Sequence, residues 1–150
     1  MLDKIPDFQM TGDDGRIYTP ADFSGKKLVL FFYPKDNTTA CTIENIDYSA
    51  LQAEFARHNC MIAGISKDGS KTHCNFKSKQ NLHHLLLTDP EWSLASSLGL
   101  IQDKTMYGKP VRGLLRSTYL FDEKGMLIKS WINIKAPGHA QEVLNFIKAL

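Results

Sequence analysis

The chain has 150 residues, of which 43% are apolar and 23% are charged, and its formal net charge is +2. A chain of this length buries roughly two thirds of its unfolded surface, so we expect residues 1–150 to fold as one domain without disulfides or metal ions. Eighteen basic residues against sixteen acidic ones argue against a dedicated nucleic-acid binder or a polybasic membrane-surface protein. The longest apolar run, Leu28 to Tyr33, is far too short to span a bilayer.

The chain carries three cysteines, Cys41, Cys60 and Cys74. No C-x-x-C pair is present, which argues against a zinc knuckle and a dithiol redox motif, and a secreted disulfide scaffold would need more cysteines in a shorter chain. The N-terminal residues show no basic segment followed by an apolar one, so no secretory signal is visible. We therefore expect a cytoplasmic protein with reduced thiols, and export by a route that reads no N-terminal signal stays open.

The N-terminal third predicts a hairpin, a buried strand and a helix. Residues 8–18 contain a turn signal, Thr11 to Gly15, between two short extended pieces. Lys27 to Tyr33 is apolar at consecutive positions, which favours a strand covered on both faces. Apolar residues at helical spacing then predict an amphipathic helix over residues 41–57. Its expected buried face is Ile43, Ile46, Ala50 and Ala53, widened by Leu51 and Phe55.

The middle of the chain alternates strands and helices. Residues 60–66 predict a second buried strand, and Asp68 or Ser70 is expected to cap a helix that runs to about Gln80. Residues 84–88 predict a short strand. Pro90 is placed to begin a short helix that ends near Leu98.

The C-terminal third is only partly assignable. Residues 99–114 give no clear pattern, whereas residues 116–121 and 126–132 predict two strands joined by a tight turn. A final helix follows Gly138, with its apolar face at Ala140, Val143, Leu144 and Ile147. The order of elements predicts an α/β thioredoxin-like sandwich, with a central mixed sheet flanked by helices and an added N-terminal hairpin.

The segment that carries chemistry lies between the first buried strand and the helix that follows it. Cys41 sits in the first turn of that helix, where unpaired N–H groups and the positive end of the helix dipole favour a thiolate. Thr38 precedes it by three residues, so its hydroxyl is placed to donate to the thiolate or to a bound oxygen atom. Pro34 has no N–H and can shield the pocket from water. Cys41 is therefore a candidate nucleophile.

This pattern, Pro34-x-x-x-Thr38-x-x-Cys41, resembles the active-site motif of the peroxiredoxins. Similarity to the bacterioferritin comigratory protein (peroxiredoxin Q) subfamily extends from about Phe8 to the final helix. The other similar segments are FFYPKDNT, Gly64–Asp68, Met106–Lys109 and Arg116–Thr118.

The resemblance implies a thiol-dependent peroxidase that reduces hydrogen peroxide and organic hydroperoxides. Cys41 would be the peroxidatic cysteine and would become a sulfenic acid, Thr38 would hold the attacked oxygen, and Pro34 would shield the site. Arg116 would hold the thiolate and stabilise the leaving oxygen. The resemblance implies no metal and no organic cofactor, a monomeric state, and recycling by thioredoxin, glutaredoxin or a small thiol.

The chain departs from the subfamily at its second cysteine. Many members carry a resolving cysteine at the position of Ile46, and some relatives place it at the position of Lys77. Cys74 lies one helical turn before Lys77, so it is the candidate resolving cysteine, with local unfolding needed to bring it to Cys41. The alternative is a one-cysteine enzyme in which Cys74 has no role. Cys60 begins a buried strand and is expected to be inert packing.

Two bland interpretations compete with specific ones elsewhere. His73, His83 and His84 lie close in sequence, but they lack matched metal-ligand spacing, so we expect structural or solvated roles. Thr39-Ala40 replaces a Pro-Gly pair common in relatives, which should change loop stiffness more than chemistry. For function, the alternative from another class is a redox-sensing or chaperone-like interaction protein switched by cysteine oxidation. A thiol–disulfide oxidoreductase is disfavoured because C-x-x-C is missing.

Overall fold

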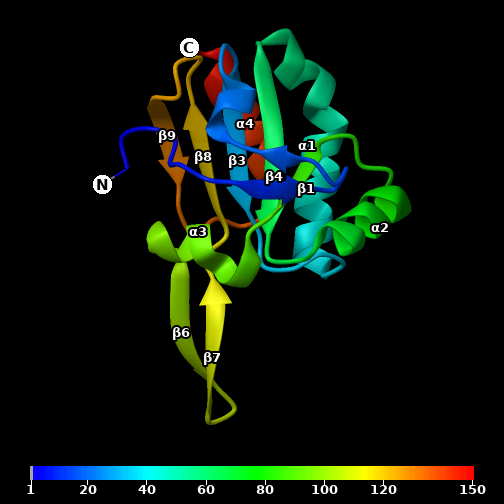
Figure 1. Cartoon of the computed structure of the whole chain (residues 1–150), viewed down its shortest axis with the longest axis vertical. Coiled ribbons are helices and arrows are strands. Elements are labelled where there is room, and N and C mark those ends of the chain that lie inside the picture. Colours follow the sequence, from blue (N-terminus) through cyan, green and yellow to red (C-terminus); the bar gives the residue numbers. More distant parts are fainter. Residues whose placement is uncertain (1) are drawn as a thin grey trace.

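The computed structural model describes residues 2–150. Within them, seven strands form a central sheet in the order β2-β1-β5-β4-β3-β8-β9, and β6 and β7 form a separate hairpin (Figure 1). The strands are β1 Met10–Gly12, β2 Ile17–Tyr18, β3 Lys27–Phe32, β4 Cys60–Ser66, β5 Leu85–Thr88, β6 Ile101–Met106, β7 Lys109–Leu114, β8 Ser117–Phe121 and β9 Leu127–Trp131. The helices are α1 Thr39–Arg57, α2 Ser70–Gln80, α3 Ser93–Ser97 and α4 His139–Lys148, with short 3-10 helices η1 Pro20–Phe23 and η2 Pro90–Trp92.

The central sheet is mixed, as the sequence predicted. β3, β4 and β5 run parallel, while β8 pairs antiparallel with β3 and β9 pairs antiparallel with β8. The predicted N-terminal hairpin is present, and its first strand also pairs antiparallel with β5, so it extends the sheet at that edge. The thioredoxin-like arrangement is confirmed.

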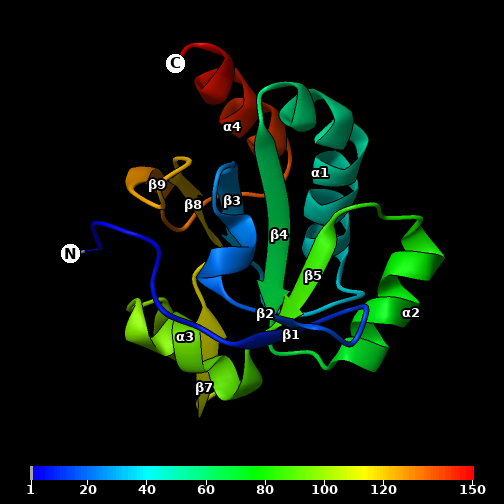
Figure 2. The same ribbon diagram turned by 45° about the horizontal axis from the view of Figure 1, so that its top comes forward.

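Strand β3 supplies side chains to both faces of the sheet, which explains its continuous apolar sequence. Val29, Phe31 and Tyr33 point into the core under α1, α2 and α4. Leu28, Leu30 and Phe32 point into the opposite core, under α3 and the N-terminal segment. Figure 2 shows these helices on the two sides of the sheet. The final helix buries the four apolar residues that the sequence placed on its inner face.

Helix α1 exists where the sequence predicted it, but its predicted buried face is wrong. Ile43 is 38% exposed and Ile46 is 41% exposed. The buried side chains are instead Cys41, Glu44, Asn45, Tyr48 and Phe55. Apolar periodicity failed because two polar residues of the inner face are hydrogen-bonded within the core, where their burial costs less.

The segment that gave no clear pattern forms the β6–β7 hairpin, which projects from the body of the molecule (Figure 1). Its turn residues Tyr107 and Gly108 both have positive φ, of 53° and 77°, as a two-residue hairpin turn requires. Nearly all of its side chains are exposed, and Tyr107 at the tip is 99% exposed. A hairpin solvated on both faces has no apolar alternation, so the usual strand signal is absent.

Two helix starts differ from expectation. The residue that caps α2 is Gly69, which has no side chain to donate or accept, and Asp68 instead accepts a hydrogen bond from the N–H of Asp36. The short helix after Asp89 is interrupted, because Glu91 and Trp92 both adopt left-handed backbone conformations. The Asp89 carboxylate then accepts from the N–H groups of Leu94 and Ala95 at the start of α3. Among residues 2–150, no helix has both the length and the apolar character needed to cross a bilayer.

Candidate active site

Cys41 lies in the first turn of α1 and is 1% exposed. Strand β3 ends at Phe32, and a loop then leads to Thr38, the residue that precedes the first helical position. The sulfur is therefore set at the carboxyl end of a central strand and at the positive end of a long helix. Both the helix dipole and the free N–H groups of the first turn favour negative charge there.

Arg116 reaches this cysteine from 75 positions later in the chain. Strand β8 runs antiparallel to β3, and Ser117 pairs with Phe32 at the end of β3. The residue before β8 is thereby placed beside the start of α1. Arg116 Nη2 donates to Cys41 Sγ over 3.3 Å, a contact that is stronger when the sulfur is a thiolate.

Glu44 holds the other side of the same guanidinium. Arg116 Nη1 donates to Glu44 Oε1 over 2.6 Å, and the Glu44 side chain is fully buried. Burial raises the pKa of Glu44 to about 7, although Arg116 opposes that shift. Burial alone would lower the pKa of Arg116, but Glu44 and Cys41 outweigh it, so its pKa lies above the usual value.

Sequence reasoning missed Glu44. The available signal was its spacing, because residues three apart on a helix lie on one face and Cys41 already marked that face as inward.

Thr38 and Pro34 border the same loop. The Thr38 side chain is exposed, and its hydroxyl donates to the carbonyl of Lys35 over 2.8 Å. The expected donation from Thr38 to the sulfur is therefore absent, since the single hydroxyl proton is already used, and the oxygen lone pairs can still accept. Pro34 is half-buried and follows the buried end of β3.

A second pair of buried polar residues supports the backbone of Cys41. Asn45 Nδ2 donates to the Cys41 carbonyl over 2.9 Å, and His84 Nε2 donates to Asn45 Oδ1 over 2.8 Å. Because Nε2 carries the proton, the ring is neutral when Nδ1 is not protonated, and burial lowers the pKa of His84 to about 3. His83 next to it is exposed, so the two histidines point to opposite sides of the strand.

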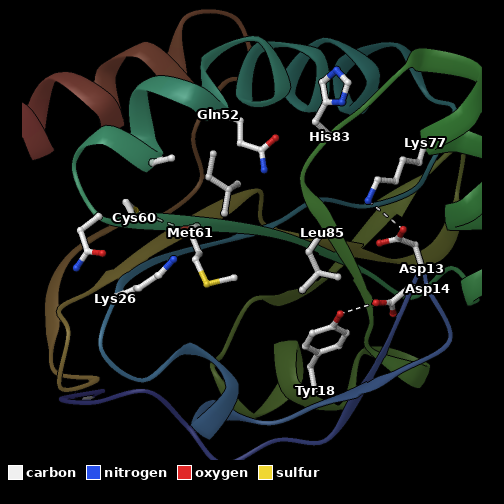
Figure 3. Close-up of a pocket in the computed structure, with 13 residues that line it drawn as sticks. Asp13, Asp14, Tyr18, Lys26, Gln52, Cys60, Met61, Lys77, His83 and Leu85 are labelled. Atoms are coloured by element: carbon white, nitrogen blue, oxygen red, sulfur yellow. Dashed lines mark hydrogen bonds and ion pairs between the residues drawn. The ribbon is translucent and has the colours of Figure 1, made fainter.

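The other two cysteines lie in different surroundings. Cys74 is exposed on α2, and all three cysteines are free thiols in the described part of the chain. Cys60 is buried at the start of β4, and burial raises the pKa of its thiol to about 12. It lines one end of a pocket of about 410 Å3 (Figure 3). At the other end Lys77, where some relatives place a cysteine, is ion-paired with Asp13.

One group of side chains has the composition of a metal site. Ligand atoms of Asp36, Asp68 and His73 all lie within 4.8 Å of one another. Hydrogen bonds already engage these groups: Asp36 faces His73, and Asp68 accepts from Ser66 and from the Asp36 N–H. The arrangement is thus accounted for by protein contacts alone.

Comparison with known proteins identifies the family. The AhpC/TSA family model matches residues 1–130. The chain belongs to the AhpC/TSA family. Peroxiredoxin Bcp of Bacillus subtilis strain 168 is 41% identical over 145 residues, which cover 97% of this chain and 92% of the relative. Peroxiredoxin Bcp of Xanthomonas campestris pv. campestris is 41% identical over 126 residues, covering 84% of this chain and 79% of the relative.

The solved structures agree with this assignment. A structure of the Xanthomonas campestris bacterioferritin comigratory protein superimposes with a TM-score of 0.89 at 37% identity, covering 95% of this chain and 90% of the other. The chain is a peroxiredoxin of the bacterioferritin comigratory protein (peroxiredoxin Q) subfamily, and it is a thiol-dependent peroxidase, as its sequence predicted. A redox sensor or chaperone-like protein is not favoured.

Proposed function

We propose that Cys41 is the peroxidatic cysteine and that it reduces hydrogen peroxide and organic hydroperoxides. The thiolate attacks one peroxide oxygen, the S–O bond forms as the O–O bond breaks, and the sulfur becomes a sulfenic acid. The departing oxygen takes a proton and leaves as water or an alcohol. The 3.3 Å contact from Arg116 to the buried Cys41 sulfur carries this proposal. The solved structure from Xanthomonas campestris described above concerns alkyl peroxide reduction, which supports the substrate class.

Arg116 is assigned to hold the thiolate and to stabilise charge on the departing oxygen. Its fork already spans Cys41 and Glu44, so the guanidinium needs little reorganisation when peroxide arrives. Thr38 is assigned to accept the peroxide O–H, since its own proton is bonded to Lys35. Pro34 is assigned to limit water at the mouth of the site.

We assign resolution of the sulfenic acid to Cys74. The Cys74 thiol would displace water from the Cys41 sulfenic acid and form a disulfide, which thioredoxin, glutaredoxin or a small thiol would reduce again. The exposure of Cys74 on α2 supports this route, since a reductant can reach it. The competing mechanism leaves Cys74 idle, and the external thiol then reduces the sulfenic acid directly.

We place the enzyme in the cytoplasm as a monomer whose residues 1–150 form one domain. Three free thiols suit a reducing compartment, and strand β3 contributes to both core clusters, which supports one folding unit.

Intact mass after one equivalent of hydrogen peroxide tests the assignment of both cysteines. The wild-type chain should lose two hydrogens as the disulfide forms, whereas Cys74→Ser should gain one oxygen. Cys41→Ser should show neither change and should have no peroxidase activity, whereas the matched Cys60→Ser should behave as wild type. Retained turnover in Cys41→Ser would overturn the peroxidatic assignment. Gain of oxygen in the wild type would overturn the role of Cys74 alone.

A further inference from the structure

Asp36 is a buried residue in an otherwise polar and exposed loop. It lies midway between Pro34 and Thr38, yet its side chain is only 2% exposed. Both carboxylate oxygens are engaged: Tyr33 donates its hydroxyl to Oδ1 over 2.6 Å, and Oδ2 lies 2.7 Å from His73 Nδ1. A carboxyl group so deeply buried and so fully hydrogen-bonded fixes the loop around it.

The partner, His73, is wholly buried and bonded at both ring nitrogens. Its Nε2 lies 3.0 Å from the carbonyl oxygen of Leu87, which can only accept, so Nε2 carries a proton. One further proton is then shared between His73 Nδ1 and Asp36 Oδ2. Whichever atom holds it, the hydrogen bond persists, and with the proton on the ring it is a charge-assisted bond between imidazolium and carboxylate.

This bond connects the two segments that carry the functional cysteines. Asp36 belongs to the loop that leads into Cys41, and His73 is the residue before Cys74 on α2. A second hydrogen bond, from the Asp36 N–H to Asp68 just before α2, follows the same route. Loop 34–38 and the first turns of α2 are therefore tied to each other at a buried point.

We propose that Asp36 and His73 are positioning residues that hold loop 34–38 closed on α2. Their bond keeps Cys41 beside Arg116 for reaction with peroxide, and it must open before Cys41 and Cys74 can meet. The inference rests on the proposed function, in which the Cys41 sulfenic acid and the Cys74 thiol condense to a disulfide with release of one water. The pair thus sets how the enzyme divides its time between the two steps.

The two steps should respond in opposite directions when the pair is broken. The peroxide step needs the closed loop, so its second-order rate constant should fall roughly tenfold or more. The disulfide step needs the open loop, so the conversion of sulfenic acid to disulfide should become faster. A variant that was merely destabilised or misfolded would slow the peroxide step without accelerating the other.

Asp36→Asn and His73→Gln test the proposal, because both keep the size and polarity of the side chain while weakening the bond. The peroxide step is measured in the Cys74→Ser background by rapid mixing with hydrogen peroxide, and the disulfide step in variants that keep Cys74. His83→Gln is the matched control, since His83 is an exposed neighbour of the same chemistry. Urea unfolding identifies any variant that has lost its fold, and the near-isosteric Asp36→Asn is the variant expected to keep it.

Amide hydrogen exchange gives a readout that does not depend on peroxidase activity. Residues 34–41 and 70–77 should exchange faster together in either variant, by roughly tenfold, while the β6–β7 hairpin should not change. The double variant should resemble each single one, because the same bond is lost. Unchanged exchange, faster exchange in only one of the segments, or a slower disulfide step would overturn the proposal. If the wild type does not react with peroxide, the proposed function fails, and the exchange result still decides whether the pair holds the loop.

Discussion

Cys41 and Cys60 are both buried cysteines, and they lie at opposite ends of helix α1. Cys41 belongs to its first turn, whereas Cys60 follows its last residue, Arg57, by three positions and begins β4. The helix dipole favours a thiolate at the first position and disfavours one at the second. Burial, the property that the two share, therefore says little about reactivity.

The cations near the two thiols differ in what they bind. Arg116 donates directly to the Cys41 sulfur, and its second arm is held by buried Glu44. Lys27 is the cation nearest to Cys60 in electrostatic effect, but it donates to the His58 carbonyl and pairs with Glu123. Burial accordingly dominates at Cys60 and raises its pKa to about 12. A reactive cysteine requires a cation whose donors are aimed at the sulfur.

Removing the aimed cation should erase most of the difference between the two thiols. Arg116→Ala is expected to lower the second-order rate constant for hydrogen peroxide by about 10²–10³-fold, because both the thiolate and the departing oxygen lose their donor. Rapid-mixing kinetics at fixed pH measures the constant. Arg112→Ala is the matched control, since Arg112 is an exposed arginine of the β6–β7 hairpin. A rate constant for Arg116→Ala within about threefold of wild type would contradict the assignment of Arg116.

Glu44 adds a second contrast, because only the Cys41 end of the helix buries a carboxylate. Its pKa is about 7 in the folded protein and about 4.5 at its ordinary value. The folded state thus binds this proton more tightly, so its stabilising contribution is complete below about pH 4.5 and is lost as pH rises through about 7. Glu44→Gln cannot titrate at this position. The free energy of unfolding of wild type minus that of the variant should therefore fall by about 1–3 kcal/mol between those pH values.

Urea unfolding of both proteins from pH 4.5 to pH 8 measures that difference and cancels the titrations that the two share, such as that of buried His84. The matched control is Glu54→Gln on the same helix, where an exposed carboxylate pairs with Arg57. That control should produce a much smaller slope. A difference for Glu44→Gln that is flat with pH would show that the carboxylate does not bind its proton more tightly in the folded state.

The sequence predicted most of the fold because most of its elements bury an apolar face. Strands β3 and β4 and helix α4 follow their apolar patterns closely, and each packs as expected. The β6–β7 hairpin gave no pattern, because its stability does not come from a buried face. The buried side of α1 was predicted wrongly for a related reason: Glu44 and Asn45 face inward to serve Arg116 and Cys41.

The candidate site was predictable only where a motif carried it. Pro34, Thr38, Cys41 and Arg116 were identified by resemblance, and the structure brings Arg116 to the sulfur across the β3–β8 pairing. Glu44, Asp36 and His73 were not identified, because their roles depend on contacts between segments distant in sequence. Thr38 shows the remaining gap, since a hydroxyl can donate or accept and only the Lys35 carbonyl decides between them.

Cys60 completes the comparison, and its removal should have the smallest effect on catalysis. Cys60→Ala should leave the peroxide rate constant within about twofold of wild type and lower the free energy of unfolding by about 1 kcal/mol, as expected for a small core truncation. With a pKa of about 12, roughly 10⁻⁴ of the Cys60 thiol is ionised at pH 8. In a Cys41→Ser, Cys74→Ser background, iodoacetamide should therefore label folded protein at least about 10³-fold more slowly than urea-unfolded protein. Comparable labelling of the two forms would mean that a buried thiol without an aimed cation is reactive after all, and the contrast with Cys41 would then need another cause.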